Sequence, residues 1–395
     1  MKILIVDDET DLELLVRQKF RKAIREEKYY FFFAGNGVEA LQIMENEPDI
    51  SIVVTDINMP EMDGLELLRH INAKKNPLLK VIIISAYSDM NNIRAAMNNG
   101  AFDFLTKPIN LDDLETTILK TIDIISVIRE GMESQSKLQD YYRDLDAARE
   151  IQQAILPNDF SILIGIRNSF DVFGKMEAAL QVGGDFFDYF VIDENRLGFV
   201  IGDVSGKGVP SAIFMAVART LIHSFGRSGL SPDECLLQTN NILCHESVDS
   251  MFVTVFYGIL YVNTGYIVYS NAGHNYPYII KNNGIVKTLS EGSSILLGAF
   301  EGAKFTSHTF NLETNDTLLL YTDGVNEAED ANDNQLGDPA LMKHLQELQG
   351  QYKHPEQIVN SIFELVKNHT KGHSQSDDIT VLAITYRGSS TSSNH

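Results

Sequence analysis

The first 125 residues of this 395-residue chain alternate short β-branched or aromatic runs with stretches whose apolar residues recur at helical spacing. Strands that alternate with helices form parallel sheets, because each helix carries the chain back to the start of the next strand. The pattern therefore predicts an α/β, doubly wound parallel sheet of five strands. The expected strands cover residues 3–6, 30–33, 52–55, 81–85 and 102–105, and the expected helices cover 12–20, 38–44, 65–71 and 93–97.

Polar side chains follow four of these strands, where ligands of such sheets bind. Asp7 and Asp8 follow the first strand, Asp56 the third, and Ser85 and Lys107 end or follow the last two. Three carboxylates that meet at one edge repel each other unless a hard cation, most simply Mg²⁺, joins them. Asp56 could then attack a phosphoryl donor while Lys107 and the metal neutralise the phosphoryl oxygens.

The strings VDDE, VVTDINMPEMDG, IIISAYSD and FLTKPIN stand in the order and spacing of two-component receiver domains, which residues 1–123 therefore resemble. The resemblance implies that a sensor histidine kinase or phosphotransfer protein phosphorylates Asp56. It also implies a cis peptide before Pro108. The other residues of the implied site are the Mg²⁺ ligands Asp8, Asp56 and the carbonyl of Asn58, with Asp7 behind them, Ser85 and Lys107 on the phosphoryl group, and Phe104 turning inward on activation.

Residues 111–156 carry almost no strand signal and no proline, which predicts a helical linker over residues 124–157. Ile118, Ile122, Ile125 and Met132 keep a four-three spacing, and the apolar phase then slips near residues 131–137. The slip indicates a soft point in the helix. A surface helix of this length needs an apolar partner, so we expect a coiled coil that forms a homodimer. The alternative is a solitary helix packed on its own domain.

Beyond Pro157 the pattern changes to many strands with Gly-rich turns and a few helices such as residues 211–225. This predicts a second α/β domain over residues 158–387, with an antiparallel β-sandwich between helices, and a disordered Ser-rich tail over 388–395. The expected strands cover residues 182–190, 197–201, 252–261, 267–270, 276–280, 317–321 and 380–385.

Four motifs of this second domain place an aspartate beside small residues at the edge of an apolar run. They are Gly183-Gly184-Asp185, Gly202-Asp203-Val204, Thr322-Asp323-Gly324 and Ser376-Asp377-Asp378. Aspartates that converge from distant positions need concentrated positive charge between them. Two divalent ions roughly 3.5–4 Å apart can lower the pKa of a shared water and direct it at phosphorus. The motifs therefore predict a site for two metals that needs no Ser or Cys nucleophile.

These motifs, with LDAAREIQQAILP, IGDVSGKGVPSAIFMA and NAGHNYP, resemble the metal-dependent protein phosphatases of the 2C superfamily, in its bacterial sporulation and stress-response branch. The resemblance covers about residues 145–386. It implies two Mn²⁺ or Mg²⁺ ions and a phosphoserine or phosphothreonine substrate on an anti-sigma-factor antagonist. The implied metal ligands are Asp185, Asp203, the carbonyl of Val204, Asp323 and Asp377, or Asp378 in place of Asp377, of which we favour Asp377.

Composition excludes several other classes. The net charge of -22 argues against nucleic acid as a main partner. Only four apolar residues follow Lys2 before Asp7, too few for a signal-peptide core, and the longest apolar stretch, residues 251–262, is typical of a buried strand. We therefore expect a cytoplasmic protein without membrane insertion, in which Cys235 and Cys244 are free thiols.

Two smaller features have competing interpretations. Residues 205–208, Ser-Gly-Lys-Gly, lack the spacing and the hydroxyl of a nucleotide-binding loop. His274, in NAGHNYP, could be a general acid, although a structural turn histidine is favoured.

The sequence thus predicts a response regulator whose output is a protein serine/threonine phosphatase. The rival hypothesis is a non-catalytic partner-switching scaffold controlled by receiver phosphorylation. The direction in which phosphorylation of Asp56 changes the activity, and the choice between Mn²⁺ and Mg²⁺, stay open at this point.

Overall fold

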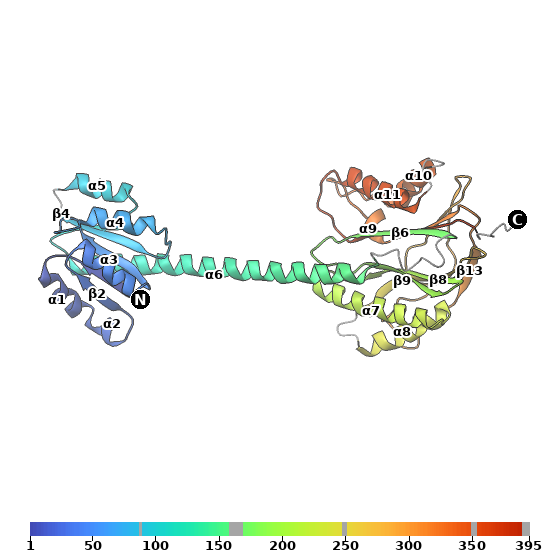
Figure 1. The fold of residues 1–395 in the computed structure, drawn as a ribbon, viewed down its shortest axis with the longest axis horizontal. Coiled ribbons are helices and arrows are strands. Elements are labelled where there is room, and N and C mark those ends of the chain that lie inside the picture. Colours follow the sequence, from blue (N-terminus) through green and yellow to red (C-terminus); the bar gives the residue numbers. More distant parts are fainter. Residues whose placement is uncertain (87–88, 158–168, 247–250, 349–353, 389–395) are drawn as a thin grey trace. The chain divides into compact units, whose positions relative to one another are not determined.

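The computed structural model describes residues 1–86, 89–157, 169–246, 251–348 and 354–388. The chain divides into two compact units, Met1–Tyr141 and Tyr142–His395 (Figure 1,). Of the tail expected to be disordered, only Gly388 lies within the described residues. Residues 158–168 of the predicted second domain lie outside them.

The first unit contains a five-stranded parallel sheet in the order β2-β1-β3-β4-β5, which confirms the predicted doubly wound architecture. All seven residues of β3 are buried, because helices cover both faces of a central parallel strand. The strands are β1 Lys2–Val6, β2 Tyr30–Ala34, β3 Ile50–Asp56, β4 Lys80–Ala86 and β5 Asp103–Lys107, and the helices before the linker are α1 Thr10–Lys19, α2 Arg21–Arg25, α3 Gly37–Asn46, α4 Gly64–Ala73 and α5 Met90–Asn98.

Helix α6, Leu111–Ile155, is continuous over 45 residues, including Gly131. The slip in apolar spacing therefore produces no break in the helix. Ile118 and Ile125 are buried in the core of the first unit, whereas Val127 is 68% exposed and Leu138 52% exposed. The early apolar residues of the helix are thus packed within the first unit. Val127 and Leu138 are not packed in this way, and the coiled coil stays a prediction.

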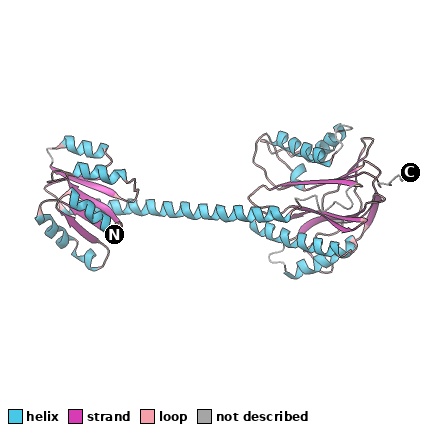
Figure 2. Ribbon diagram, viewed as in Figure 1, coloured by secondary structure: helices cyan, strands magenta, loops and turns pink. Residues whose placement is uncertain are grey.

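The second unit contains two five-stranded sheets, β13-β10-β9-β8-β7 and β12-β11-β14-β15-β6, whose paired strands are all antiparallel. Figure 1 shows α7 and α8 beside the first sheet and α10 and α11 beside the second, and Figure 2 distinguishes these helices and strands by colour. The strands are β6 Phe170–Glu177, β7 Phe186–Asp193, β8 Arg196–Val204, β9 Val253–Tyr261, β10 Tyr266–Ala272, β11 Tyr278–Ile280, β12 Val286–Thr288, β13 His308–Asn311, β14 Thr317–Tyr321 and β15 Ile379–Tyr386. The helices are α7 Val209–Arg227, α8 Pro232–Glu246, α9 Asp323–Asn326, α10 Gly337–Glu347 and α11 Pro355–Thr370.

Alternation along β14 shows how the two cores are separated. Leu318 and Leu320 belong to the core between the sheets, while Leu319 and Tyr321 belong to the core under α10 and α11. Side chains of a strand point to opposite faces in turn, so one strand serves both layers. The predicted β-sandwich between helices is confirmed.

The strand β7 begins later than the sequence pattern predicts, and the helix α7 is unusually apolar. The strand expected from residue 182 begins at Phe186, because Gly183, Gly184 and Asp185 form a turn before it. Helix α7 is, within the described ranges, the one helix long and apolar enough to cross a membrane by length and composition. Its Met215, Ala218 and Ile222 are buried in a hydrophobic core of the second unit, as in the core helix of a globular domain.

We expect Ile201→Ala, in the middle of β8, to destabilise the second unit by about 2–5 kcal/mol, because Ile201 is fully buried and its loss leaves a cavity. Ile285→Ala, at a 51% exposed residue just before β12, is the control and should change stability by about 0.5 kcal/mol or less. Urea unfolding followed by circular dichroism measures both. Equal losses in the two variants would show that β8 does not occupy the core.

Candidate active sites

The first site lies at the carboxyl edge of the parallel sheet. Among the described residues, Asp7, Asp8 and Asp56 form the group whose ligand atoms all lie within 4.8 Å of one another. Asp56 ends β3 and is buried, Asp7 is half-buried just after β1, and Asp8 is exposed. Burial raises the pKa of Asp7, and the charge of Asp56 adds to this effect. The group suits a hard divalent cation such as Mg²⁺, which would relieve the repulsion.

Lys107, at the end of β5, supplies the positive charge present in this site. Its Nζ lies 2.8 Å from Asp56 Oδ2 and 3.3 Å from Asp7 Oδ2. Although burial lowers the pKa of Lys107, its hydrogen bond and charge interaction with Asp56 raise it overall. The Lys107–Pro108 peptide is cis, as expected. Lys107 is therefore a permanent cation beside the residue that is expected to be phosphorylated.

The remaining predicted receiver residues differ in their burial. Ser85, near the end of β4, is fully buried, and its Oγ has no hydrogen-bond partner in the part of the chain described. A buried hydroxyl without a partner is unusual, and a phosphoryl oxygen beside it would accept its hydrogen bond. Asn58 is exposed, and Phe104 is 38% exposed. The inward turn of Phe104 stays a prediction.

The second site brings together the aspartates of the four motifs. Asp203 lies in β8, Asp323 begins α9, and Asp377 precedes β15 by two residues. Burial, followed by the charges of Asp323 and Asp377, raises the pKa of Asp203 to about 7. Burial, Glu327 and Asp377 likewise raise the pKa of Asp323 to about 6. The carboxylates therefore lie close enough to repel one another.

Asp185 completes this group from the turn before β7. It is 1% exposed, and burial with the charges of Asp203 and Asp378 raises its pKa well above the usual range. Thr322 Oγ1 donates a 2.6 Å hydrogen bond to Asp185 Oδ2 and fixes the carboxylate in place. Within the described ranges no three of these aspartates meet the 4.8 Å spacing of the receiver group. Four separate segments bring together carboxylates that raise one another's pKa, and such a set fits the expected pair of metals.

The two neighbouring aspartates at the last motif have different surroundings. Asp378 is buried, its Oδ1 accepts the Ala179 N–H at 2.8 Å, and its Oδ2 accepts the Gly184 N–H at 2.6 Å. Asp378 thus holds the turn that carries Asp185. Asp377 Oδ1 accepts the N–H of Asp378 at 2.9 Å, while Oδ2 faces the ammonium of Lys207 at 3.0 Å. Asp377 is the one with an oxygen turned toward a cation.

Small residues permit the close approach of these segments. A Cβ on Gly324 would lie 1.9 Å from the carbonyl oxygen of Asp378, and one on Gly183 would lie 2.3 Å from Asp378 Oδ2. Either contact is shorter than any real Cβ contact. The glycines of these motifs therefore admit the neighbouring backbone and carboxylate. The carbonyl of Val204, another predicted ligand, accepts a 3.3 Å hydrogen bond from Ser211 Oγ.

Gln152 belongs to the second site, although no sequence motif predicts a role for it there. Its side chain, near the end of α6, donates to the Gly183 carbonyl at 2.6 Å and accepts the Gly183 N–H at 3.1 Å. Gln152 is 6% exposed. The only sequence signal for it is its place in the LDAAREIQQAILP string. Helix α6 is thus bonded to the turn that carries Asp185.

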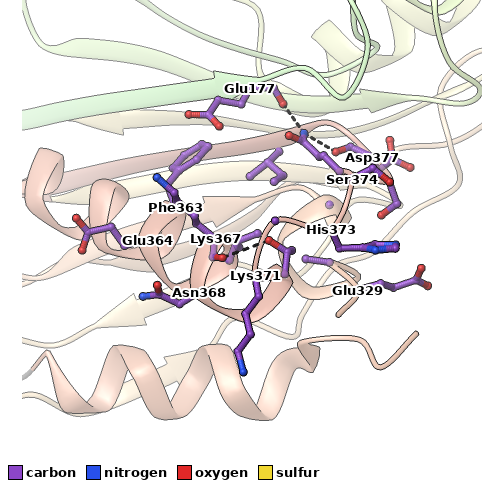
Figure 3. Close-up of a pocket in the computed structure, with 18 of the residues that line it drawn as sticks. Glu177, Glu329, Phe363, Glu364, Lys367, Asn368, Lys371, His373, Ser374 and Asp377 are labelled. Carbon is purple, nitrogen blue, oxygen red and sulfur yellow. Dashed lines mark hydrogen bonds between the residues drawn. The ribbon is translucent and has the colours of Figure 1, made fainter. Parts of the chain in front are cut away.

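A cleft of about 950 Å³ adjoins Asp377. Figure 3 shows it between β6, which carries Glu177, and α11, which carries Phe363 and Lys367. Gln375 also lines the cleft, and its Nε2 donates to the backbone carbonyls of Glu177 and Asp377. The space is large enough for several residues of a polypeptide, not only for a phosphate group.

His274 is enclosed behind the second site. It is 4% exposed, its ring Nδ1 lies 2.8 Å from Thr254 Oγ1, and its backbone N–H donates to Asn271 Oδ1 at 2.8 Å. Burial lowers the pKa of His274 to about 4, against a smaller opposing effect of the Tyr321 backbone. This environment suits a structural turn histidine and not a general acid that must reach substrate.

Comparison with known proteins matches both halves of the chain to families. The model of the response regulator receiver domain matches residues 3–119, and that of stage II sporulation protein E matches residues 193–387. Sporulation initiation phosphotransferase F of Bacillus subtilis is 34% identical over 126 residues, which cover 32% of this chain and 96% of that protein.

Two further proteins resemble the second half. Phosphoserine phosphatase RsbU of Bacillus subtilis is 28% identical over 233 residues, covering 58% of this chain and 64% of that relative, so the chain spans less than two thirds of its length. The SiaA-PP2C domain of Pseudomonas aeruginosa has a similar fold, with a TM-score of 0.55 at 23% identity, over 65% of this chain and 99% of that domain.

We expect His274→Gln to flatten the pH dependence of stability of the second unit between pH 6.5 and 4. His274 binds a proton at a lower pH when folded than when unfolded, so its neutral state adds stability that is lost as pH falls through this window. The wild type should lose up to about 1.4 kcal/mol per pH unit more than the variant. Urea unfolding at pH 7 and pH 5 measures this, with His373→Gln, at an exposed position, as control. Parallel pH profiles for all three proteins would contradict it.

Proposed function

We propose that this chain, which belongs to the response regulators through its receiver domain and carries a phosphatase domain of the stage II sporulation protein E type, is a metal-dependent protein serine/threonine phosphatase under receiver control. The observation that carries the proposal is the convergence of Asp185, Asp203, Asp323 and Asp377, whose mutual repulsion calls for divalent cations. The second family's match and the phosphoserine phosphatase relative support the same activity.

At the receiver site, Asp56 would act as the nucleophile toward a phosphohistidine of a sensor kinase or phosphotransfer protein. One oxygen of its carboxylate would form the bond to phosphorus while the bond from phosphorus to the histidine nitrogen breaks. Asp8, Asp56 and the Asn58 carbonyl would hold Mg²⁺, which supplies charge neutralisation when bound. Lys107 already touches Asp56 and would bind one phosphoryl oxygen, and Ser85 Oγ would donate to another.

At the second site, Asp185, Asp203, Asp323, Asp377 and the Val204 carbonyl would hold the two metals. Two Mn²⁺ or Mg²⁺ ions would supply Lewis acidity, which activates a water for in-line attack on the phosphomonoester. Thr322 keeps Asp185 oriented, and Asp378 holds the backbone of residues 179–184. The aspartates themselves form no covalent bond to phosphorus, in contrast to Asp56.

The substrate we propose is a phosphoserine or phosphothreonine on a regulatory protein of the anti-sigma-factor antagonist type. The cleft beside Asp377 has room for the polypeptide on either side of the phosphorylated residue. Since the chain's acidic charge repels polyanions, nucleic acid is not expected as a partner. We place the protein in the cytoplasm, where response regulators meet their kinases.

Helix α6 is proposed to carry the signal between the sites. Its Gln152 bonds to Gly183, so a movement of the helix end would move the turn that bears Asp185. An apolar groove of about 480 Å³ also lies between the end of α6 and α7. Ile151 on α6 and Ile213 on α7 line it and are more than 60% exposed. These exposed apolar side chains, together with those of the linker, support a homodimer that forms through α6.

The rival proposal is a partner-switching scaffold without turnover. A scaffold has no need to keep buried carboxylates with raised pKa values in one place, because their repulsion only destabilises it. The retained set of aspartates therefore favours an enzyme.

We expect Asp203→Ala to abolish metal-dependent phosphate release from a phosphoprotein substrate, because the alanine removes a ligand that both metals would share. Asp193→Ala, at an exposed aspartate that pairs with Arg196, is the control and should retain activity. Phosphate release with Mn²⁺ or Mg²⁺ measures both variants. Equal rates in wild type and Asp203→Ala would rule out the proposed metal site.

We expect beryllofluoride, a mimic of the phosphoryl group, to change both the phosphatase rate and the molecular mass of the wild type. The mimic would draw Lys107 and Ser85 toward it and so change the conformation of the receiver domain. Asp56→Asn, which cannot carry the mimic, is the control and should respond in neither measurement. If the wild type also fails to respond, receiver control through α6 has to be abandoned.

A further inference from the structure

We propose that Lys207 binds a phosphoryl oxygen of the substrate at the second site. This inference rests on the proposed phosphatase function and adds a residue to it. Lys207 stands in the loop between β8 and α7, and its Nζ lies 3.0 Å from Asp377 Oδ2 and also donates to the Ser376 carbonyl. Its side chain is 48% exposed, so the ammonium borders both the aspartates and solvent.

The charge balance of the site calls for such a cation. Four carboxylates and two divalent ions sum to zero, so a phosphomonoester, which carries a charge of about -1.5 to -2, would still lack a counter-charge. Within the described ranges, Lys207 is the basic side chain that forms an ion pair with one of these aspartates. Its charge also lowers the pKa of Asp323, which places it near two of the four.

Three other cations of the second unit are engaged elsewhere. Lys175 pairs with Glu177 at 2.7 Å and lies over the ring of Phe363. Arg219 pairs with the buried Asp188 at 2.9 Å. Lys281 pairs with Asp316 at 2.7 Å. None of these three ion pairs includes an aspartate of the site, whereas the ion pair of Lys207 does.

The backbone of the loop supports this role. Gly206 and Gly208 have φ angles of 87° and 78°, in the left-handed region that favours glycine, and a Cβ on either would meet nothing within 4 Å. The glycines are therefore needed for the path of the loop and not for space. Helix α7 begins at Val209 without a side-chain cap, so its positive end adds to the charge of Lys207 at the same loop.

The pairing of Lys207 with Asp377 has a consequence for metal binding. If a metal were bound through Asp377 Oδ2, it would compete with the Lys207 ammonium for that oxygen. The ammonium would then be available to a phosphoryl oxygen. Removal of the charge should therefore weaken phosphate binding without weakening metal binding, which a merely structural lysine would not do.

The test compares the full chain with Lys207→Met, Lys207→Arg and the control Lys343→Met, at a position 76% exposed on α10. Calorimetry first measures Mn²⁺ binding to each protein and then the binding of inorganic phosphate to the Mn²⁺-loaded form. We expect Lys207→Met to raise the dissociation constant of phosphate about tenfold or more, with a Mn²⁺ constant equal to or below that of the wild type. Lys207→Arg should stay within about threefold for phosphate, and Lys343→Met should match the wild type.

Kinetics with p-nitrophenyl phosphate add a second readout, in which Lys207→Met should raise KM. Unchanged phosphate binding in Lys207→Met would overturn the inference. So would a parallel loss of Mn²⁺ and phosphate binding, which would make Lys207 a support for Asp377 only. Phosphate binding needs no turnover, so a wild type that hydrolyses nothing would refute the proposed function and still leave this test decisive. Thermal unfolding of each variant checks that it is folded.

Discussion

The repulsion between carboxylates at the ends of strands is the constraint on which both sites depend. In the receiver, Asp7, Asp8 and Asp56 have ligand atoms within 4.8 Å of one another, and Lys107 offsets part of their charge. In the second unit, burial and mutual repulsion raise the pKa values of Asp203 and Asp323 to about 7 and about 6. Such groups cost free energy unless cations join them. Both sites thus suit metals, and in our proposal only the first contains an aspartate that reacts.

At the second site, Asp378 supports the backbone, whereas the other carboxylates would bind cations. Asp378 accepts hydrogen bonds from the backbone at Ala179 and Gly184, and Gln152 bonds to Gly183 between them. The turn that carries Asp185 is therefore held by the last motif on one side and by α6 on the other. Such a turn can respond to a helix that moves by a small distance, because its position depends on a few directed hydrogen bonds.

Much of this arrangement could be predicted from the sequence, because strand patterns and aspartate motifs are local signals. The parallel sheet follows from alternation, and Asp7, Asp8 and Asp56 follow from their places after strands. The roles of Asp378 and Gln152 could not be predicted in this way. Each depends on a contact with residues 179–184 from a distant part of the chain, and no local pattern records which oxygen a backbone N–H will reach. The start of β7 at Phe186 was missed for a related reason, since an apolar run does not reveal the turn within it.

The central claim is that phosphorylation of Asp56 acts on the turn that carries Asp185. Amide hydrogen exchange at residues 183–185, with and without beryllofluoride on the wild type, tests it most directly. The account predicts a changed exchange rate at these amides, because their hydrogen bonds to Gln152 and Asp378 would be altered through α6. Identical exchange at residues 183–185, alongside clear protection around Asp56, would contradict it.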